Sequence, residues 1–166
     1  MTRYGLLIDY DFCIGCHTCE LACALSHSEA EDIVSLFASG EKPVYRIRVT
    51  TKKSKAVAEV CRQCAKPACE IACPTGACKR LAPGKPVLVN EELCDANTLC
   101  VEACSFDMMF MSADGKVAVK CDLCLHRLAD GLQPACVAAC PTHALHYDDG
   151  KEVKGEKGQS VAVAEV

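Results

Sequence analysis

Cysteines are the residues of this chain whose type and spacing could do chemistry, with 16 of them among 166 residues. Cys78 stands alone, and the other 15 fall into four groups with short, recurring intervals. Cysteines at this density serve as disulfide partners, zinc ligands or ligands of iron–sulfur clusters. The four groups are Cys13-x2-Cys16-x2-Cys19-x3-Cys23, Cys61-x2-Cys64-x4-Cys69-x3-Cys73, Cys94-x5-Cys100-x3-Cys104 and Cys121-x2-Cys124-x11-Cys136-x3-Cys140.

The spacing within the groups favours iron–sulfur clusters. A cubane [4Fe–4S] cluster needs four converging thiolates, and Cys-x2-Cys-x2-Cys supplies three of them from one tight loop. A fourth cysteine, often before proline as at Pro74 and Pro141, points to the second cluster of a pair. Zinc ribbons instead use two separated Cys-x2-Cys knuckles, so three cysteines within residues 13–19 would crowd one zinc ion.

The start of the chain and its composition narrow the setting. Residues 1–5 show no charged segment leading into an apolar run, so we predict a reducing, cytoplasmic location in which thiols stay free for metals. A net charge of -4 disfavours a nucleic-acid partner. No apolar run approaches the ~20 residues that cross a bilayer, which predicts no direct membrane span. The hydrophobic fraction of 51% includes the cysteines, so bound metal must help to hold the core together.

Internal repetition predicts how the loops are positioned. Residues 6–13 align with residues 87–94 as a short strand that leads into a cysteine loop, and in this frame Asn97 takes the position of Cys16. Residues 73–78 align with residues 140–145, which places Cys78 opposite Leu145. Such repetition indicates a duplicated supersecondary unit.

The remaining pattern predicts short elements. Alternation over residues 44–49, a polar turn at 52–55 and a return over 56–60 predict a hairpin. The x3 spacing before each last cysteine places it about one helical turn from its neighbour. Short helices are therefore expected around residues 19–27, 68–73, 99–104 and 136–140, with a polar tail over residues 148–166.

Two segments resemble a known family. Residues 61–77 resemble the second cluster motif, and residues 120–142 the fourth, of four-cluster ferredoxin-like electron-transfer subunits of molybdenum and tungsten oxidoreductases, the dimethyl sulfoxide reductase iron–sulfur subunit type. Within that family, the chain resembles the small subunits of tungsten aldehyde oxidoreductases and class II benzoyl-CoA reductases. The resemblance implies an α+β fold over residues 1–147, with duplicated ferredoxin-like halves of short strands and helices around iron–sulfur clusters. Groups 13–23 and 121–140 would form one half, and groups 61–73 and 94–104 the other.

The resemblance also implies which cysteines share a cluster. Asn97 stands where the fourth site expects a cysteine, and its neutral amide is a poor iron ligand. That site could hold [3Fe–4S], [4Fe–4S] with another ligand, or no cluster; Cys78 could replace the missing ligand, although a free cysteine is more often a buried small hydrophobe. Carried over residue by residue, the four sets are Cys13, Cys16, Cys19 and Cys140; Cys121, Cys124, Cys136 and Cys23; Cys61, Cys64, Cys69 and Cys104; and Cys94, Cys100 and Cys73 with Asn97.

The expected function is electron transfer without catalysis. No nucleophile–base pair, phosphate-binding glycine loop or G-x-G-x-x-G motif is present. The resemblance implies a relay between a large tungsten- or molybdenum-cofactor catalytic subunit, of aldehyde oxidoreductase or benzoyl-CoA reductase type, and an external electron donor or acceptor or a flavoprotein subunit. The alternatives are a relay subunit of a hydrogenase, formate dehydrogenase or carbon monoxide dehydrogenase, a free polyferredoxin, and a zinc-stabilised structural module.

Overall fold

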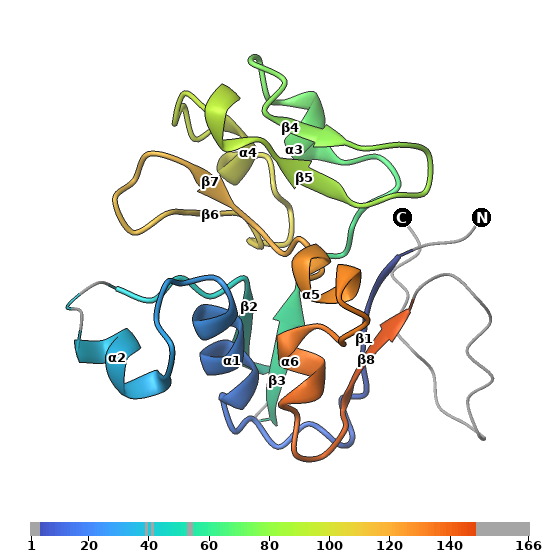
Figure 1. Cartoon of the computed structure of the whole chain (residues 1–166). Coiled ribbons are helices and arrows are strands. Elements are labelled where there is room, and N and C mark those ends of the chain that lie inside the picture. Colours follow the sequence, from blue (N-terminus) through green and yellow to red (C-terminus); the bar gives the residue numbers. More distant parts are fainter. Residues whose placement is uncertain (1–3, 39, 41, 53–54, 149–166) are drawn as a thin grey trace.

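The computed structural model describes residues 4–38, 40, 42–52 and 55–148. Its elements are short, and the strands form four separate two-stranded antiparallel sheets within these residues. The elements gather into a lower and an upper group, joined by the segments that carry Cys61 and Cys121 (Figure 1). The expected tail over residues 148–166 lies outside the described residues except for Asp148, as does the centre of the turn at 53–54.

The lower group joins the two ends of the described chain. Leu6 pairs with Tyr147 in the sheet of the first and last strands, and the first helix packs on the helix that precedes the last strand. A hairpin of two six-residue strands lies beside them (Figure 1). The elements are β1 (Gly5–Ile8), α1 (Thr18–Ser26), α2 (Ile33–Ala38), β2 (Ile47–Lys52), β3 (Lys55–Val60), α5 (Leu125–Ala129), α6 (Ala135–Ala138) and β8 (Leu145–Asp148).

The upper group comes from the middle of the chain. Cys78 pairs with Val89 in one hairpin, Phe110 pairs with Val119 in another, and two one-turn helices pack against each other. The elements are α3 (Ala68–Ile71), β4 (Cys78–Arg80), β5 (Val87–Val89), the 3-10 helix η1 (Glu91–Leu93), α4 (Leu99–Glu102), β6 (Phe110–Met111) and β7 (Ala118–Val119).

Each group has its own core, and thiols fill much of it. The lower core packs Ile47, Leu123 and Leu145 with buried cysteines. The upper core packs Val87 and Met109 with further cysteines. With so few large apolar side chains, packing alone supplies little stabilisation, and bonds to the sulfur atoms must supply the rest.

The predicted hairpin is confirmed, but β2 begins at Ile47 rather than at residue 44. The backbone N–H of Arg46 explains the difference, because it donates to the Sγ atom of Cys23 at 3.3 Å and not to the neighbouring strand. The four expected helices are also present, and α3, α4 and α6 end before the cysteine that closes each group. Sequence reasoning did not identify α2, α5, β4, β6, β7, β8 or η1.

Left-handed backbone shapes the cysteine loops. Gly15 has φ 66°, and His17, the residue immediately before α1, has φ 62°. A Cβ atom at Gly15 would lie 2.3 Å from the Cβ atom of Ala56 on β3. Glycine is therefore required at position 15 both by its backbone and by the close approach of the hairpin.

Replacing Gly15 by Ala is expected to lower the free energy of unfolding by about 2–5 kcal/mol, because steric overlap with Ala56 adds to the cost of a side chain at positive φ. Gly115→Ala is the matched control: its φ is 74°, and its added Cβ would meet nothing within 4 Å. The control should lose only about 1–2 kcal/mol. Thermal unfolding followed by circular dichroism measures both, and equal shifts would contradict the role of the close approach.

Candidate iron–sulfur centres

The first set of cysteines lines one small cavity. The loop that precedes α1 supplies Cys13 and Cys16, the first turn of α1 supplies Cys19, and Cys140 follows the end of α6. Cys16 is exposed, whereas Cys19 is buried. Burial raises the pKa of Cys19 to about 12, with Glu20 and the neighbouring cysteines adding to the effect. The four sulfur-bearing side chains thus converge from both ends of the described chain.

The second set is the most deeply placed. Cys23, Cys121, Cys124 and Cys136 are all buried. Burial raises the pKa of Cys136, and the charges of Cys23 and Cys124 raise it further, so these three side chains are close neighbours. Burial also raises the pKa of Cys121, and the charges of other cysteines, Cys136 among them, raise it further.

The third set lines a broad cavity in the upper group. Cys61, Cys64, Cys69 and Cys104 face it together. Burial raises the pKa of Cys64, and each of the other three adds to the rise. The backbone N–H of Met108 donates to the Sγ atom of Cys104 at 3.4 Å.

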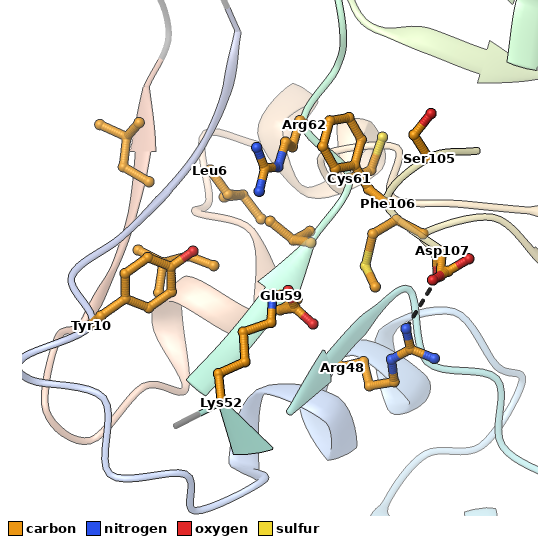
Figure 2. A pocket seen from close by; sticks show the side chains of 14 residues that line it. Leu6, Tyr10, Arg48, Lys52, Glu59, Cys61, Arg62, Ser105, Phe106 and Asp107 are labelled. Carbon is orange, nitrogen blue, oxygen red and sulfur yellow. Dashed lines mark hydrogen bonds and ion pairs between the residues drawn. The ribbon is translucent and has the colours of Figure 1, made fainter. Parts of the chain in front are cut away.

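A separate, polar pocket opens beside this third set (Figure 2). Arg62 lies over the ring of Phe106 at 4.1 Å, and Arg48 donates to the carbonyl oxygen of Asp107 at 3.3 Å. Residues of β1 and β3 line one side and residues 105–108 the other. The pocket thus lies between the lower and upper groups of elements. Cys61 is the one cysteine in its lining, so this pocket is not a site for a cluster.

The fourth set has three cysteines of the expected four. Cys73, Cys94 and Cys100 line a cavity with Asn97, as the repeat predicts, and Cys78 lines it as well. The backbone N–H of Cys78 donates to the Sγ atom of Cys73 at 3.4 Å, and that of Ala118 donates to the Sγ atom of Cys94 at 3.4 Å. The structure therefore brings every predicted site residue beside the others of its set.

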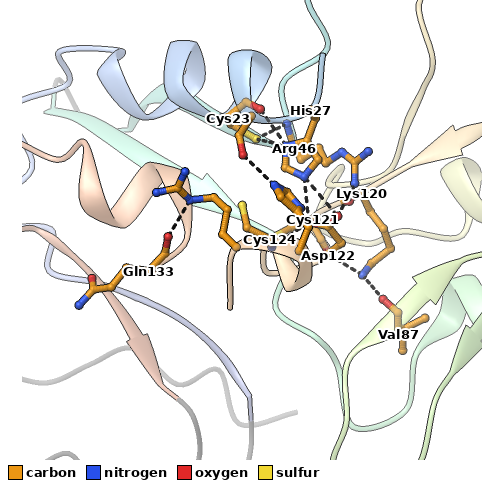
Figure 3. A network of polar contacts seen from close by, with 12 residues as sticks. Cys23, His27, Arg46, Val87, Lys120, Cys121, Asp122, Cys124 and Gln133 are labelled. Carbon is orange, nitrogen blue, oxygen red and sulfur yellow. Dashed lines mark hydrogen bonds and ion pairs between the residues drawn. The ribbon is translucent and has the colours of Figure 1, made fainter. Parts of the chain in front are cut away.

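A buried ammonium lies between the second and third sets. Lys120 is 3% exposed, and its Nζ atom donates to the carbonyl oxygens of Val87 at 2.6 Å and Cys121 at 2.9 Å (Figure 3). Gln63, also buried, accepts a third bond from Lys120 and donates to the same Cys121 carbonyl at 2.9 Å. No carboxylate of the described residues forms an ion pair with Lys120. A hydrogen bond with the neighbouring thiol of Cys78 lowers the pKa of Cys69, and the charge of Lys120 lowers it further.

These features fit iron–sulfur clusters. An unpaired buried cation is costly, and negatively charged thiolates nearby would offset that cost. Backbone N–H groups already point at several sulfur atoms, and such hydrogen bonds help to set cluster potentials. Four converging thiols in each of three sets match the donor set of a [4Fe–4S] cluster.

A polar network fixes the loop that carries the second set. Arg46 donates to the Oδ2 atom of Asp122 at 2.9 Å, and His27 contacts the Oδ1 atom of Asp122 at 3.1 Å (Figure 3). Burial alone would lower the pKa of His27, but hydrogen bonds to Asp122 and Cys23 raise it to about 9. Burial opposes ionisation of Asp122, yet His27 and Arg46 hold its pKa well below the usual range. The Oδ1 atom also accepts the N–H of Cys124 at 2.9 Å.

Sequence reasoning missed this network and Lys120. Asp122 and Lys120 flank Cys121 inside the segment 120–142, which carries the family resemblance, so the sequence did offer a signal for both residues. Nothing in the sequence relates His27 or Arg46 to that motif across some 76 to 95 positions. Their roles became visible only when the fold placed α1 and β2 beside the loop.

Comparisons with known proteins agree with this chemistry. The family model of the 4Fe-4S dicluster domain matches residues 53–150, and that of a 4Fe-4S binding domain matches residues 4–25. The chain belongs to the 4Fe-4S dicluster family. This dicluster protein therefore binds more than one [4Fe–4S] cluster, which confirms the prediction made from cysteine spacing.

Relatives of this dicluster protein serve electron transport. It is 41% identical over 160 residues to the electron transport protein HydN of Escherichia coli K12, covering 87% of each chain. It is 33% identical over 170 residues to one subunit of the anaerobic dimethyl sulfoxide reductase of Haemophilus influenzae, covering 99% of this chain and 82% of that subunit. A solved chain of the BamBC active site complex of benzoyl coenzyme A reductase, in complex with zinc, aligns over 93% of this chain and 82% of its own, with 22% identity and a TM-score of 0.44.

The described part of this dicluster protein contains no helix with the length and apolar character that crossing a bilayer demands.

Replacing Lys120 by Met in this dicluster protein is expected to lower the reduction potentials of the clusters nearest to it. A buried positive charge favours the reduced, more negative state of a cluster, and a loss of about 1 kcal/mol corresponds to about 40 mV for one electron. Potentiometric titration followed by EPR measures the change. Lys120→Arg keeps the charge and should restore most of the potential, and Lys116→Met, at an exposed lysine, should change nothing. Unchanged potentials in a fully loaded Lys120→Met protein would contradict this role.

Proposed function

We propose that the chain is the non-catalytic electron-relay subunit of an oxidoreductase complex, built over residues 1–147 from two ferredoxin-like halves. The arrangement of the cysteines carries this proposal. Segments 13–23 and 121–140 lie together in the lower group, and segments 61–73 and 94–104 lie together in the upper group, which is the nesting expected of a duplicated two-cluster ferredoxin.

The proposed ligand sets are those in which the side chains share a cavity or influence one another's pKa. Each set takes three cysteines from one segment and one from the segment nested with it, except where Asn97 replaces a cysteine. The sets are Cys13, Cys16, Cys19 and Cys140; Cys121, Cys124, Cys136 and Cys23; Cys61, Cys64, Cys69 and Cys104; and Cys94, Cys100 and Cys73.

The nearness of successive sets to one another supports a linear path. A cysteine of each set lies close enough to one of the next set for the charge of one to raise the pKa of the other. Iron–sulfur clusters take up and release one electron at a time. A line of sets from the lower group to the upper group would therefore connect two distant surfaces of the protein. The three linking pairs are Cys19 with Cys136, Cys61 with Cys121, and Cys69 with Cys100.

The protein surrounds this path with groups that tune charge. Lys120 and Gln63 lie where the second set meets the third, and their hydrogen bonds to the carbonyl of Cys121 hold both side chains in place. Backbone N–H groups of Arg46 and Met108 point at sulfur atoms of the second and third sets. These residues would position the sulfur atoms and favour added negative charge.

The proposed partner is a large tungsten- or molybdenum-cofactor catalytic subunit, of the aldehyde oxidoreductase or benzoyl-CoA reductase type, in a cytoplasmic complex. Its counterpart at the other end of the relay would be an external donor or acceptor or a flavoprotein subunit. The resemblance of residues 61–77 and 120–142 supports this pairing, and so does the likeness to a subunit of a dimethyl sulfoxide reductase. The likeness to HydN favours a second candidate, an electron carrier for a different enzyme.

Metal analysis of the complex, purified without oxygen from its native host, tests the proposal. Iron and sulfide together with tungsten or molybdenum are expected, because the relay would copurify with its catalytic subunit. Iron with nickel, or iron alone, would contradict the proposed partner and leave the relay role standing. Zinc without iron would contradict both.

A further inference from the structure

The fourth cavity keeps the loop conformation of the first, although it lacks one cysteine. Ala96 has φ 58° and Thr98 has φ 63°, and their counterparts in the repeat, Gly15 and His17, have φ 66° and 62°. Thr98 is the residue immediately before α4, just as His17 is the residue immediately before α1. Position by position, the loop with Asn97 is therefore shaped like the loop with Cys16.

This conformation is costly for the residues that adopt it. Left-handed backbone at a residue other than glycine costs about 1–2 kcal/mol of conformational free energy, and a β-branched residue such as Thr98 is especially disfavoured there. A loop released from its ligand could relax into an easier conformation. Strain of this kind persists where the surroundings require the geometry, so the loop is still built to hold something.

The sulfur atoms of the fourth cavity are still presented as ligands. Cys73 accepts the N–H of Cys78, and Cys94 accepts the N–H of Ala118, both at 3.4 Å. The same kind of bond reaches Cys104 in the third set. The space at this cavity, open solvent at its mouth included, is about 280 Å³, close to the 320 Å³ at the first, so the two sites are similarly open.

Asn97 is not presented as a ligand. Its Nδ2 atom donates to the Oδ1 atom of Asp95 at 2.6 Å, and its Oδ1 atom accepts the backbone N–H of Leu99 at 3.0 Å. The amide thus caps the start of α4 and holds the loop closed. A neutral amide already engaged in two hydrogen bonds cannot replace a thiolate on iron.

Cys78 lies at a different corner of the cavity. It occupies the place that Leu145 has in the first cavity, on the inner wall, where it is 1% exposed and close to Cys69 of the third set. The cysteine that Asn97 replaces, Cys16 in the first cavity, is instead exposed on the outer loop. The thiol of Cys78 is engaged with Cys69 of the third set, so we assign Cys78 no ligand role at the corner beside Asn97.

The geometry points to a [3Fe–4S] cluster in the fourth cavity, held by Cys73, Cys94 and Cys100, with the missing iron at the corner beside Asn97. This inference rests on the ligand sets of the proposed function. Three thiolates match three irons, and the anchored amide closes the corner where a fourth iron would need a ligand. The other three sets keep four thiolates each and hold [4Fe–4S].

EPR and iron analysis of the oxygen-free, full-length protein test the inference. The oxidised wild-type protein should give the narrow, nearly isotropic signal of a [3Fe–4S] cluster, which oxidised [4Fe–4S] clusters do not give. Asn97→Cys should abolish that signal and add one iron per chain. Asn97→Ala removes the amide without adding a thiolate and should keep the signal, which controls for disturbance of the loop.

Two cysteine variants separate the remaining outcomes. Cys100→Ser should remove the signal and three irons, whereas Cys78→Ser should leave signal and iron unchanged. If the wild-type protein gave no [3Fe–4S] signal and Asn97→Cys contained four more irons per chain, the wild-type site would be empty and the inference overturned. No signal in the wild type, with the signal arising in Cys78→Ser, would make Cys78 a ligand and overturn it too. Four irons lost in Cys100→Ser, with iron unchanged in Cys78→Ser, would mean a four-iron cluster with a ligand from outside the chain, again against the inference. Absence of the other [4Fe–4S] signals after reduction would instead count against the relay function itself.

Discussion

Sulfur atoms from distant parts of the chain have to converge on a few points, and the placement of the other elements follows from that requirement. The strands are two to six residues long and the helices four to nine, too short to be stable alone. Most of them end at, or lead into, a loop that carries cysteines, so the hairpins and turns act as supports for those loops. His17, Thr98 and Cys124 adopt an unfavourable positive φ, and each of them connects a ligand loop directly to the first residue of a helix.

Charge is the second constraint, because bringing many thiolates into a protein interior is unfavourable unless positive groups or N–H donors accompany them. The protein meets it with a buried lysine between the two groups of elements and with backbone N–H groups aimed at sulfur. The Arg46–Asp122–His27 network has a different task. It ties the end of α1 and the start of β2 to the loop of Cys121, so the lower group holds its deepest cysteines rigidly.

Much of this arrangement could be predicted from the sequence, because the spacing of the cysteines restricts the backbone conformations that bring their sulfur atoms together. Cys-x2-Cys-x2-Cys followed by Cys at x3 defines a loop and a helical turn, and the repeat of residues 6–13 at 87–94 places a strand before two of the loops. The short strands β6 and β7 and the helix α5 escaped prediction because their two to five residues show no periodicity. The network of His27 and Lys120's hydrogen bonds also escaped, since such contacts depend on tertiary packing that no local pattern encodes.

The pairing of β1 with β8 has a consequence for how the chain is made. Residues 5–8 leave the ribosome early, but their strand partner at 145–148 emerges last among the described residues, so the lower group cannot close during most of synthesis. The upper group draws its hairpin β4–β5 and helices α3 and α4 from residues 68–102, and these contacts are local. Local contacts form faster than distant ones. The middle of the protein can therefore acquire its structure on the ribosome, while the cysteines of residues 13–23 wait, unpaired and open to oxidation, for the end of the chain.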